Sequence, residues 1–143
     1  MSEILIQAKN IKKYFPTSDR GKVVKAVDDI SFDIYKGETL GVVGESGCGK
    51  STTGRMVLKL LDCTEGSVLY KGKDIGKMKG KEMRSLRKEM QIIFQDPYAS
   101  LDPRKTVFQI LAEPFWIHHP EMRKEDIYRE VEKLIECVGL RPE

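Results

Sequence analysis

The sequence predicts an α/β fold organised around a glycine-rich loop that joins a strand to a helix. The loop is the stretch GESGCGKST at 44–52, which has three glycines among its first six residues. The β-branched run TLGVV precedes it at 39–43, and apolar residues at helical spacing follow it at 52–61. Strand-like runs dominate the first half of the chain, and helical patterns dominate after residue 105.

Each element is predicted from its apolar spacing and its flanking turn residues. Strands are expected over 4–15, 23–34, 38–44, 67–75 and 91–94, and helices over 52–61, 80–90, 106–115 and 123–140. The intervening turns lie at 16–21 and 62–66, and the loop 95–105 contains two prolines. Pro114 is expected to end the third helix. Gly139 favours the end of the fourth helix, which has the clearest apolar stripe of the chain.

The glycine-rich loop has the residue types that a nucleotide phosphate needs. Gly44, Gly47 and Gly49 can adopt positive φ, so successive backbone N–H groups can point inward at an anion. The helix that begins near Lys50 adds its free N–H groups and the positive end of its dipole. The spacing G-x-x-x-x-G-K-S places the lysine on the β- and γ-phosphates and the Ser51 hydroxyl on Mg²⁺. A glycine-rich turn without a ligand is the alternative, and the strand–loop–helix setting disfavours it.

The bulk composition is that of one modest globular domain. The chain has 143 residues, of which 33% are charged and 40% hydrophobic. The net charge of +3 is too weak and dispersed to indicate a nucleic-acid partner. No apolar run approaches the ~20 residues that span a bilayer, and the N-terminus lacks the apolar core of a signal peptide. A cytoplasmic location is therefore expected.

The three cysteines indicate neither a metal site nor a disulfide framework, because their number is odd and their spacing matches no ligand pattern. Cys63 and Cys137 are interpreted as small apolar or surface residues. Cys48 lies in the glycine-rich loop near a helix N-terminus and Lys50, a setting that makes a thiol reactive. We expect Cys48 to be alkylated readily and to be protected by bound ATP, with no catalytic role.

With these motifs in place, the chain resembles the ATP-binding subunit of ABC transporters. Three segments are similar to the F-type ATPase subunit of oligopeptide and dipeptide importers, the peptide/nickel group: KKYFP (12–16), VKAVDDISFDIYKGETLGVVGESGCGKST (24–52) and QDPYASLDPRKTV (95–107). The resemblance covers essentially the whole chain. It implies an incomplete P-loop NTPase fold of the ABC type, with an N-terminal antiparallel β part and the start of a helical subdomain. We expect the strand-rich nucleotide-binding part at 1–105 and the helical part at 106–143.

The resemblance also implies a role for single residues in binding MgATP. Lys50 and Gln95 would be the catalytic residues, and Ser51 and Gln95 would contact Mg²⁺. Gln95 would be the Q-loop glutamine, which reports the nucleotide state to the membrane subunits, and Thr52 would lie close to the α-phosphate. The expected nucleotide-binding residues are Phe15, Gly44, Glu45, Ser46, Gly47, Cys48, Gly49, Lys50, Ser51 and Thr52.

An aromatic residue near the N-terminus stacks on adenine in this family. Phe15 occupies the expected place by its spacing from Ile11, and its neighbour Tyr14 remains an alternative. Without the resemblance, either aromatic would be interpreted as ordinary packing.

Four further elements of the family have no counterpart in the sequence: the LSGGQ signature, the Walker B strand ending in Asp, the catalytic Glu after it and the switch His. His118 and His119 in WIHHP do not match the switch setting and are interpreted as a surface loop pair. We therefore expect the N-terminal portion of such a subunit, which hydrolyses ATP negligibly by itself. The missing strands should leave an unpaired edge, so the isolated chain is expected to self-associate.

The resemblance implies that the full subunit powers peptide import by ATP binding and hydrolysis. Its partners would be transmembrane permease subunits, a second ATPase subunit of the related D-type and, indirectly, an extracytoplasmic substrate-binding protein. It would act at the cytoplasmic face of the membrane as a peripheral protein, without a nucleic-acid partner. Two alternatives stay open: a standalone P-loop nucleotide-binding or regulatory module without hydrolysis, and another P-loop enzyme such as a small kinase.

Overall fold

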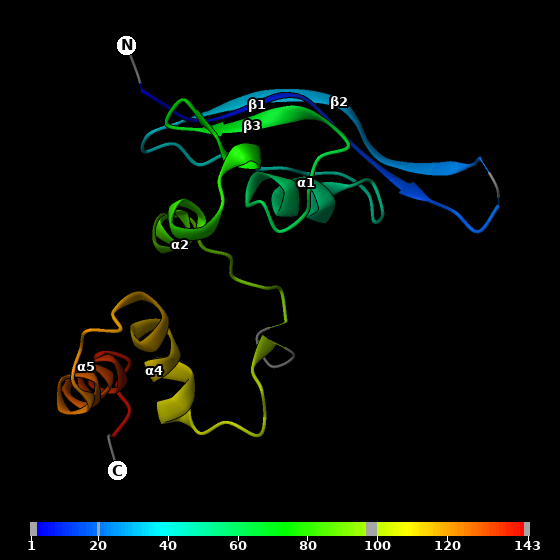
Figure 1. Cartoon of the computed structure of the whole chain (residues 1–143). Helices are drawn as coiled ribbons and strands as arrows, with labels where there is room; N and C mark the ends of the chain where they lie inside the picture. The colour runs from blue at the N-terminus through cyan, green and yellow to red at the C-terminus, as the bar shows by residue number, and fades with distance from the viewer. Residues whose placement is uncertain (1–2, 20, 97–99, 142–143) are drawn as a thin grey trace. The chain divides into compact units, whose positions relative to one another are not determined.

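The computed structural model of the chain describes residues 3–19, 21–96 and 100–141. The chain divides into two compact units, Met1–Gln91 and Ile92–Glu143. The first contains an antiparallel sheet with helices, and the second contains a pair of packed helices (Figure 1). Residues 97–99 of the segment QDPYASLDPRK lie outside the described residues.

The first unit is built on a four-stranded sheet with the strand order β2-β1-β3-β4. All neighbouring strands pair antiparallel, so the antiparallel β part predicted for the N-terminal region is confirmed. The strands are β1 (Ile4–Pro16), β2 (Val23–Tyr35), β3 (Glu65–Tyr70) and β4 (Lys73–Asp74). The register of the long β1–β2 hairpin shifts around Asn10 and Asp29, which have φ of 46° and 57°. The Asn10 side chain donates a hydrogen bond to Asp29 Oδ1 at 3.0 Å, which holds the two irregular positions together.

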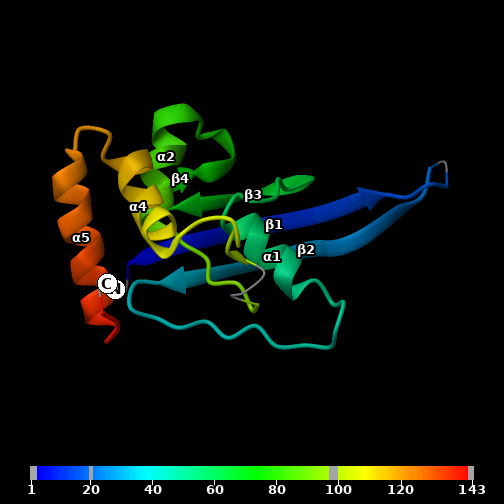
Figure 2. The same ribbon diagram turned by 90° about the horizontal axis from the view of Figure 1, so that it is seen from below.

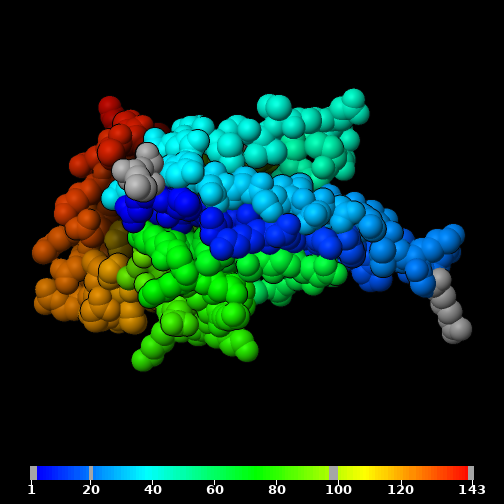
Figure 3. All heavy atoms as spheres, turned by 90° about the horizontal axis from the view of Figure 1, so that it is seen from above, coloured from blue at the N-terminus to red at the C-terminus, as the bar shows by residue number. Residues whose placement is uncertain are grey.

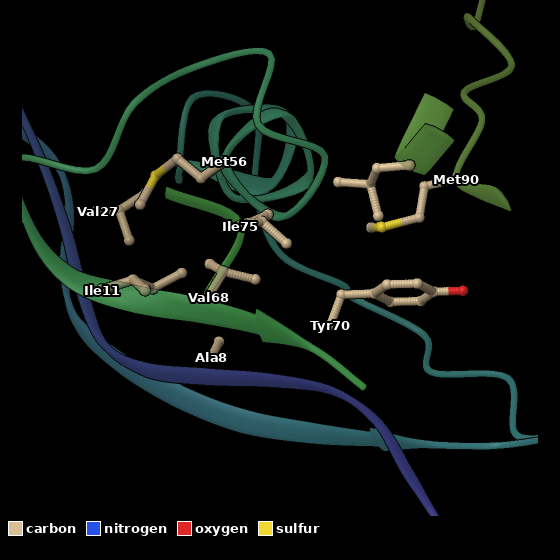
Figure 4. Close-up of a cluster of buried hydrophobic side chains, with 9 residues drawn as sticks. Ala8, Ile11, Val27, Met56, Val68, Tyr70, Ile75 and Met90 are labelled. Atoms are coloured by element: carbon tan, nitrogen blue, oxygen red, sulfur yellow. The ribbon is translucent and has the colours of Figure 1, made fainter. Parts of the chain in front are cut away.

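The helices of the first unit lie on one face of this sheet, and α1 crosses β1 and β2 (Figure 2). They are α1 (Lys50–Val57), the short 3₁₀ helix η1 (Ile75–Lys77) and α2 (Gly80–Glu89). In the core, Met56 of α1 points toward Val27 and lies above Ile11 (Figure 4). The buried core consists of Ala8, Ile11, Val27, Met56, Val68, Tyr70, Ile75, Leu86 and Met90. Burial of these side chains ties the loop-bearing helix to the sheet.

The other face of the sheet is open, and β1 and β2 run across it side by side (Figure 3). Because side chains alternate along a strand, Gln7 points away from the buried Ala8 beside it. Its amide donates to Asp33, its register partner on β2, at 3.0 Å. Lys12 forms an ion pair of 2.8 Å with Glu65 of β3. Polar pairs across neighbouring strands therefore support the sheet away from the core.

A polar contact joins β3 to α2 at the edge of the core. The Tyr70 hydroxyl donates to Glu89 Oε2 at 2.8 Å, and the ammonium of Lys71 donates to the same oxygen. Lys71 holds the pKa of Glu89 below its usual range, with help from Tyr70. The hydrogen bond to Glu89 in turn raises the pKa of Lys71 to about 12. The contact helps to fix α2, the helix that leads into residues 91–95.

The second unit packs α4 (Val107–His118) against α5 (Lys124–Cys137). Its core is Ala112, Ile127 and Val131, and the rings of Phe108 and Tyr128 stack with centroids 4.2 Å apart. The predicted helix over 123–140 is confirmed, apart from its ends. No helix in the described ranges is long and apolar enough to cross a membrane.

The expectation that Pro114 ends its helix is wrong. Pro114 lies inside α4, which continues to His118. The proline removes one backbone N–H donor, but Thr106 and Gln109 form a complete capping box at the start of the helix, and the flanking Leu111 and Phe115 pack on the core. The histidine interpretation is also partly wrong, because His118 is the half-buried last residue of α4 and only His119 is an exposed residue beyond it.

Two predicted strands are absent from the described residues: neither 38–44 nor 91–94 pairs with another strand there. Their apolar side chains face solvent, and the exposed fractions of Val43 and Ile93 reach 92% and 96%. Strand preference depends on pairing and burial, so a β-branched run forms a strand only where a neighbouring strand receives it. The exposed apolar residues of the two segments are Leu40, Val42, Val43, Ile92, Ile93 and Phe94.

Candidate functional site

The glycine-rich loop ends at the N-terminus of α1. Gly49 is the N-cap residue with φ 95° and ψ 3°, and Gly47 has φ 81°, so both are left-handed. The Cys48 N–H donates to the Glu45 carbonyl at 3.4 Å and closes the loop. No described side chain caps this helix end, and its first turn contains no acidic residue. Its N–H groups and its dipole are thus left for an external anion.

Lys50 places its ammonium group at this helix end. Its Nζ donates to the Gly44 carbonyl at 2.8 Å and to the Glu45 carbonyl at 2.6 Å, and it lies 3.7 Å from Cys48 Sγ. The side chain folds back over its own loop and is half-buried. A positive charge and an uncapped helix N-terminus therefore converge on one loop, which is the arrangement that binds a phosphate.

The loop packs against β2 with almost no free space at one point. A β-carbon added to Gly49 would lie 2.3 Å from the Ala26 carbonyl oxygen and 3.5 Å from Val27 Cγ2. Only glycine fits there without a shift of the loop or the strand. The sequence contains no signal for this contact, because Ala26 and Val27 look like ordinary strand residues.

The strand β2, which packs against the loop, also pairs with the predicted adenine-stacking residue. Phe15 on β1 pairs with Val24 on β2, two residues before Ala26. Phe15 is 38% exposed, and the Lys13 ammonium lies 5.3 Å from the centroid of its ring. An exposed ring on the hairpin beside the loop is available to a base.

Tyr14 is engaged in contacts of its own. Its hydroxyl donates to Asp28, and the Lys25 ammonium lies 5.2 Å from the centre of its ring. The hydrogen bond to Asp28 raises the pKa of Tyr14 and lowers that of Asp28. Adjacent strand residues point to opposite faces, so the side chains of Tyr14 and Phe15 leave the hairpin on different sides. Phe15 stays the predicted stacking residue.

The remaining predicted residues divide between the two units. Ser51 is exposed and Thr52 half-buried in the first turn of α1, and Glu45 and Ser46 are exposed in the loop. Gln95 is exposed in the second unit, so its role beside the loop stays a prediction.

The residues present fit a magnesium ion that is held mainly by its nucleotide. Within the described ranges, no group of three or more His, Cys, Asp or Glu side chains could hold a metal ion. Mg²⁺ in nucleotide sites commonly takes few protein ligands and completes its shell with phosphate oxygens and water. The exposed Ser51 hydroxyl, next to Lys50, suits that role.

We predict that MgATP protects Cys48 from alkylation, because its sulfur lies beside the Lys50 ammonium and a bound phosphate would cover the loop. At about ten times the dissociation constant, MgATP should slow labelling by iodoacetamide roughly tenfold. Mass spectrometry gives the rate at each cysteine. Cys137 is exposed on α5 and serves as the internal reference. Equal rates at Cys48 with and without MgATP would refute this prediction.

The chain is similar in sequence to transport ATP-binding proteins. A family model described as ABC transporter matches residues 27–142. The oligopeptide transport ATP-binding protein OppF of Bacillus subtilis is 52% identical over 144 residues, which cover 100% of this chain and 47% of that protein. OppF of Escherichia coli is 42% identical over 147 residues, which cover 98% of this chain and 44% of that protein. The chain thus spans about half the length of the curated relatives it matches.

Solved structures share the fold. A dimeric post-hydrolysis state of the ATP-binding cassette MJ0796, bound to ADP and Pi, superposes with a TM-score of 0.79 at 22% identity, over 96% of this chain and 58% of that one. Another dimeric structure of this cassette gives a TM-score of 0.75 at 24% identity, over 94% of this chain and 56% of that one. The predicted α/β fold of the ATP-binding cassette type is therefore confirmed.

Proposed function

Because the chain belongs to the ABC transporter family, we propose that it forms the nucleotide-binding portion of an ATP-binding subunit that powers peptide import. The observation that carries this proposal is the convergence of the Lys50 ammonium and the uncapped N-terminus of α1 on one glycine-rich loop. The names of the relatives, oligopeptide transport ATP-binding proteins, support peptides as the substrate class.

The residues of the loop would bind and orient the nucleotide. The N–H groups at the start of α1 and the Lys50 ammonium neutralise the β- and γ-phosphates, and the Ser51 hydroxyl contacts Mg²⁺. Phe15 stacks on the adenine from the β1–β2 hairpin. Gln95 orients the attacking water or contacts the metal, and it passes the nucleotide state to the membrane subunits. In this chemistry the protein contributes mainly positioning and charge neutralisation.

The proposed subunit works at the cytoplasmic face of the membrane as a peripheral protein. Its partners are transmembrane permease subunits and a second ATPase subunit of the related D-type, and the extracytoplasmic substrate-binding protein acts indirectly. Two such ATPase domains would enclose two ATP molecules, and their closure would drive the permease.

We predict that the 143-residue chain by itself releases phosphate from ATP at no more than the rate of its Lys50→Ala variant. The sequence contains no LSGGQ signature, which would complete the nucleotide site. It also contains no apolar run ending in Asp-Glu, whose carboxylates would polarise the attacking water. In P-loop enzymes such groups supply much of the rate enhancement. Phosphate release measured with both proteins at saturating MgATP tests this. Robust turnover that is abolished by Lys50→Ala would contradict it.

We also predict that the isolated chain associates with itself. In the apolar segments 39–43 and 92–94, Val43 and Ile93 are almost completely exposed. Segments with exposed apolar side chains and an unpaired backbone associate readily with other chains. Light scattering over a range of concentrations should give a mass that rises above 16.3 kDa. Val43→Lys together with Ile93→Lys should reduce the association. A monomer at all concentrations would contradict the prediction.

The coding sequence downstream of Glu143 distinguishes the proposed function from the standalone module. An in-frame LSGGQ followed by an apolar run that ends in Asp-Glu supports the importer subunit. A stop codon directly after Glu143 supports the nucleotide-binding module without hydrolysis and contradicts the importer ATPase.

A further inference from the structure

We propose that Arg87 of α2 is a positioning residue for the phosphate loop, because it holds the C-terminal end of α1, the helix whose N-terminus carries that loop. The inference rests on the proposed nucleotide-binding function. Arg87 lies outside the glycine-rich loop, and neither its spacing nor its neighbours in the sequence point to this role.

α1 ends in a turn whose left-handed residue is a lysine. The Lys59 N–H donates to the Met56 carbonyl at 2.9 Å, and the Leu60 N–H donates to the Arg55 carbonyl at 2.8 Å, the two hydrogen bonds of a Schellman motif. Glycine usually fills the left-handed position of this motif, but Lys59 fills it here with φ 53°. Because a side chain is strained in that conformation, the turn depends on contacts from elsewhere.

Arg87 supplies such contacts from α2. Its guanidinium donates from Nη1 to the Leu58 carbonyl and from Nη2 to the Lys59 carbonyl, the second at 3.0 Å. These carbonyls belong to the helix end, where acceptors lack intrahelical partners. The positive charge also faces the negative end of the α1 dipole. Arg87 is half-buried by these contacts, whereas Arg84, one turn earlier on α2, is exposed.

α1 is thereby held at both of its ends. Gly49 abuts the Ala26 carbonyl at the N-terminus, and Arg87 binds the C-terminus. With eight residues, the helix is only about 12 Å long, so its two ends lie close together. Release of the C-terminal end would therefore shift Lys50 and the loop N–H groups relative to the phosphates. Such misplacement is costly in sites that act by positioning.

Four variants separate this role from its alternatives: Arg87→Ala, Arg87→Lys, Arg87→Ala combined with Lys59→Gly, and Arg84→Ala as the matched control on the same helix. Hydrogen exchange at the Leu60 and Leu61 amides, which both donate to the Arg55 carbonyl, reports the helix end. Calorimetry with MgATP reports the loop. Circular dichroism confirms that each variant is folded under the conditions used, and Arg87→Lys serves as the test if Arg87→Ala does not fold.

We expect Arg87→Ala to accelerate exchange at both amides and to weaken MgATP binding at least about fivefold, while Arg84→Ala stays within about twofold of the unmodified chain. Arg87→Lys should recover only part of the affinity, because an ammonium cannot reproduce the two-pronged contact. Lys59→Gly should restore affinity in the Arg87→Ala background, because glycine removes the strain at the left-handed position.

The outcomes are distinguishable. Unchanged exchange in Arg87→Ala would show that Arg87 does not anchor α1. Faster exchange with unchanged MgATP affinity would show that the anchor does not position the loop. If the unmodified chain binds no MgATP, the proposed function fails instead, and with it the positioning role, while the exchange comparison still decides whether Arg87 holds the helix end.

Discussion

Lys50→Ala is expected to weaken MgATP binding by roughly a hundredfold or more, or about 3 kcal/mol, because it removes charge-assisted hydrogen bonds to the phosphates. The ammonium already lies over the loop, 2.8 Å from the Gly44 carbonyl and 2.6 Å from the Glu45 carbonyl. Displacement of a fluorescent ATP analogue measures the change in affinity.

Two further variants make this measurement specific. Lys81→Ala removes an exposed lysine from α2 and should leave the affinity unchanged within about twofold, since surface charges away from a site contribute little. Lys50→Arg keeps the charge but changes its shape, and it should bind more weakly than the unmodified chain. Equal affinities for Lys50→Ala and the unmodified chain would place the nucleotide elsewhere.

Gly49→Ala is expected to destabilise the first unit by about 3 kcal/mol or more, because a backbone clash adds to the strain of a left-handed alanine. The added β-carbon would lie 2.3 Å from the Ala26 carbonyl oxygen, and φ is 95°. Either the loop moves away from β2 or the strand shifts. Nucleotide binding should weaken in parallel, since Gly49 is the N-cap residue of α1. Urea denaturation followed by circular dichroism measures the loss of stability.

Gly47→Ala is the matched control for that experiment. Gly47 is also left-handed, with φ 81°, but a β-carbon there meets nothing within 4 Å. The substitution should cost only about 1 kcal/mol of backbone strain. A comparable loss in the two variants would mean that conformation alone explains the effect and that the contact with Ala26 is unimportant.

The sequence predicted best the features that depend on local pattern. The glycine-rich loop with α1 behind it and the amphipathic α5 follow from glycine spacing and apolar periodicity, which are properties of a few adjacent turns. The resemblance to ABC transporters, which rests on GESGCGKST (44–52) and on QDPYASLDPRKTV (95–107) among its segments, is borne out by the family match over 27–142.

The predictions that were wrong concern features that depend on contacts with residues distant in the sequence. The runs at 38–44 and 91–94 have strand composition, but no strand pairs with them among the described residues, so they form no strand there and are exposed. Pro114 fits inside α4 because neighbouring residues pack on α5.

Two contacts around the candidate site also could not be predicted from the sequence. The Ala26 carbonyl beside Gly49 and the Arg87 guanidinium on the end of α1 are set by how β2 and α2 approach the helix. Ala26 looks like an ordinary strand residue and Arg87 like one charge of a solvated helix face.

Calorimetric titration of MgATP into the unmodified chain shows whether this loop and this helix end form a working phosphate site. We expect saturable binding of one nucleotide per chain, competition by MgADP, and loss of the signal in Lys50→Ala. Binding that persists in Lys50→Ala, or no binding by a chain that circular dichroism shows to be folded, would contradict this expectation.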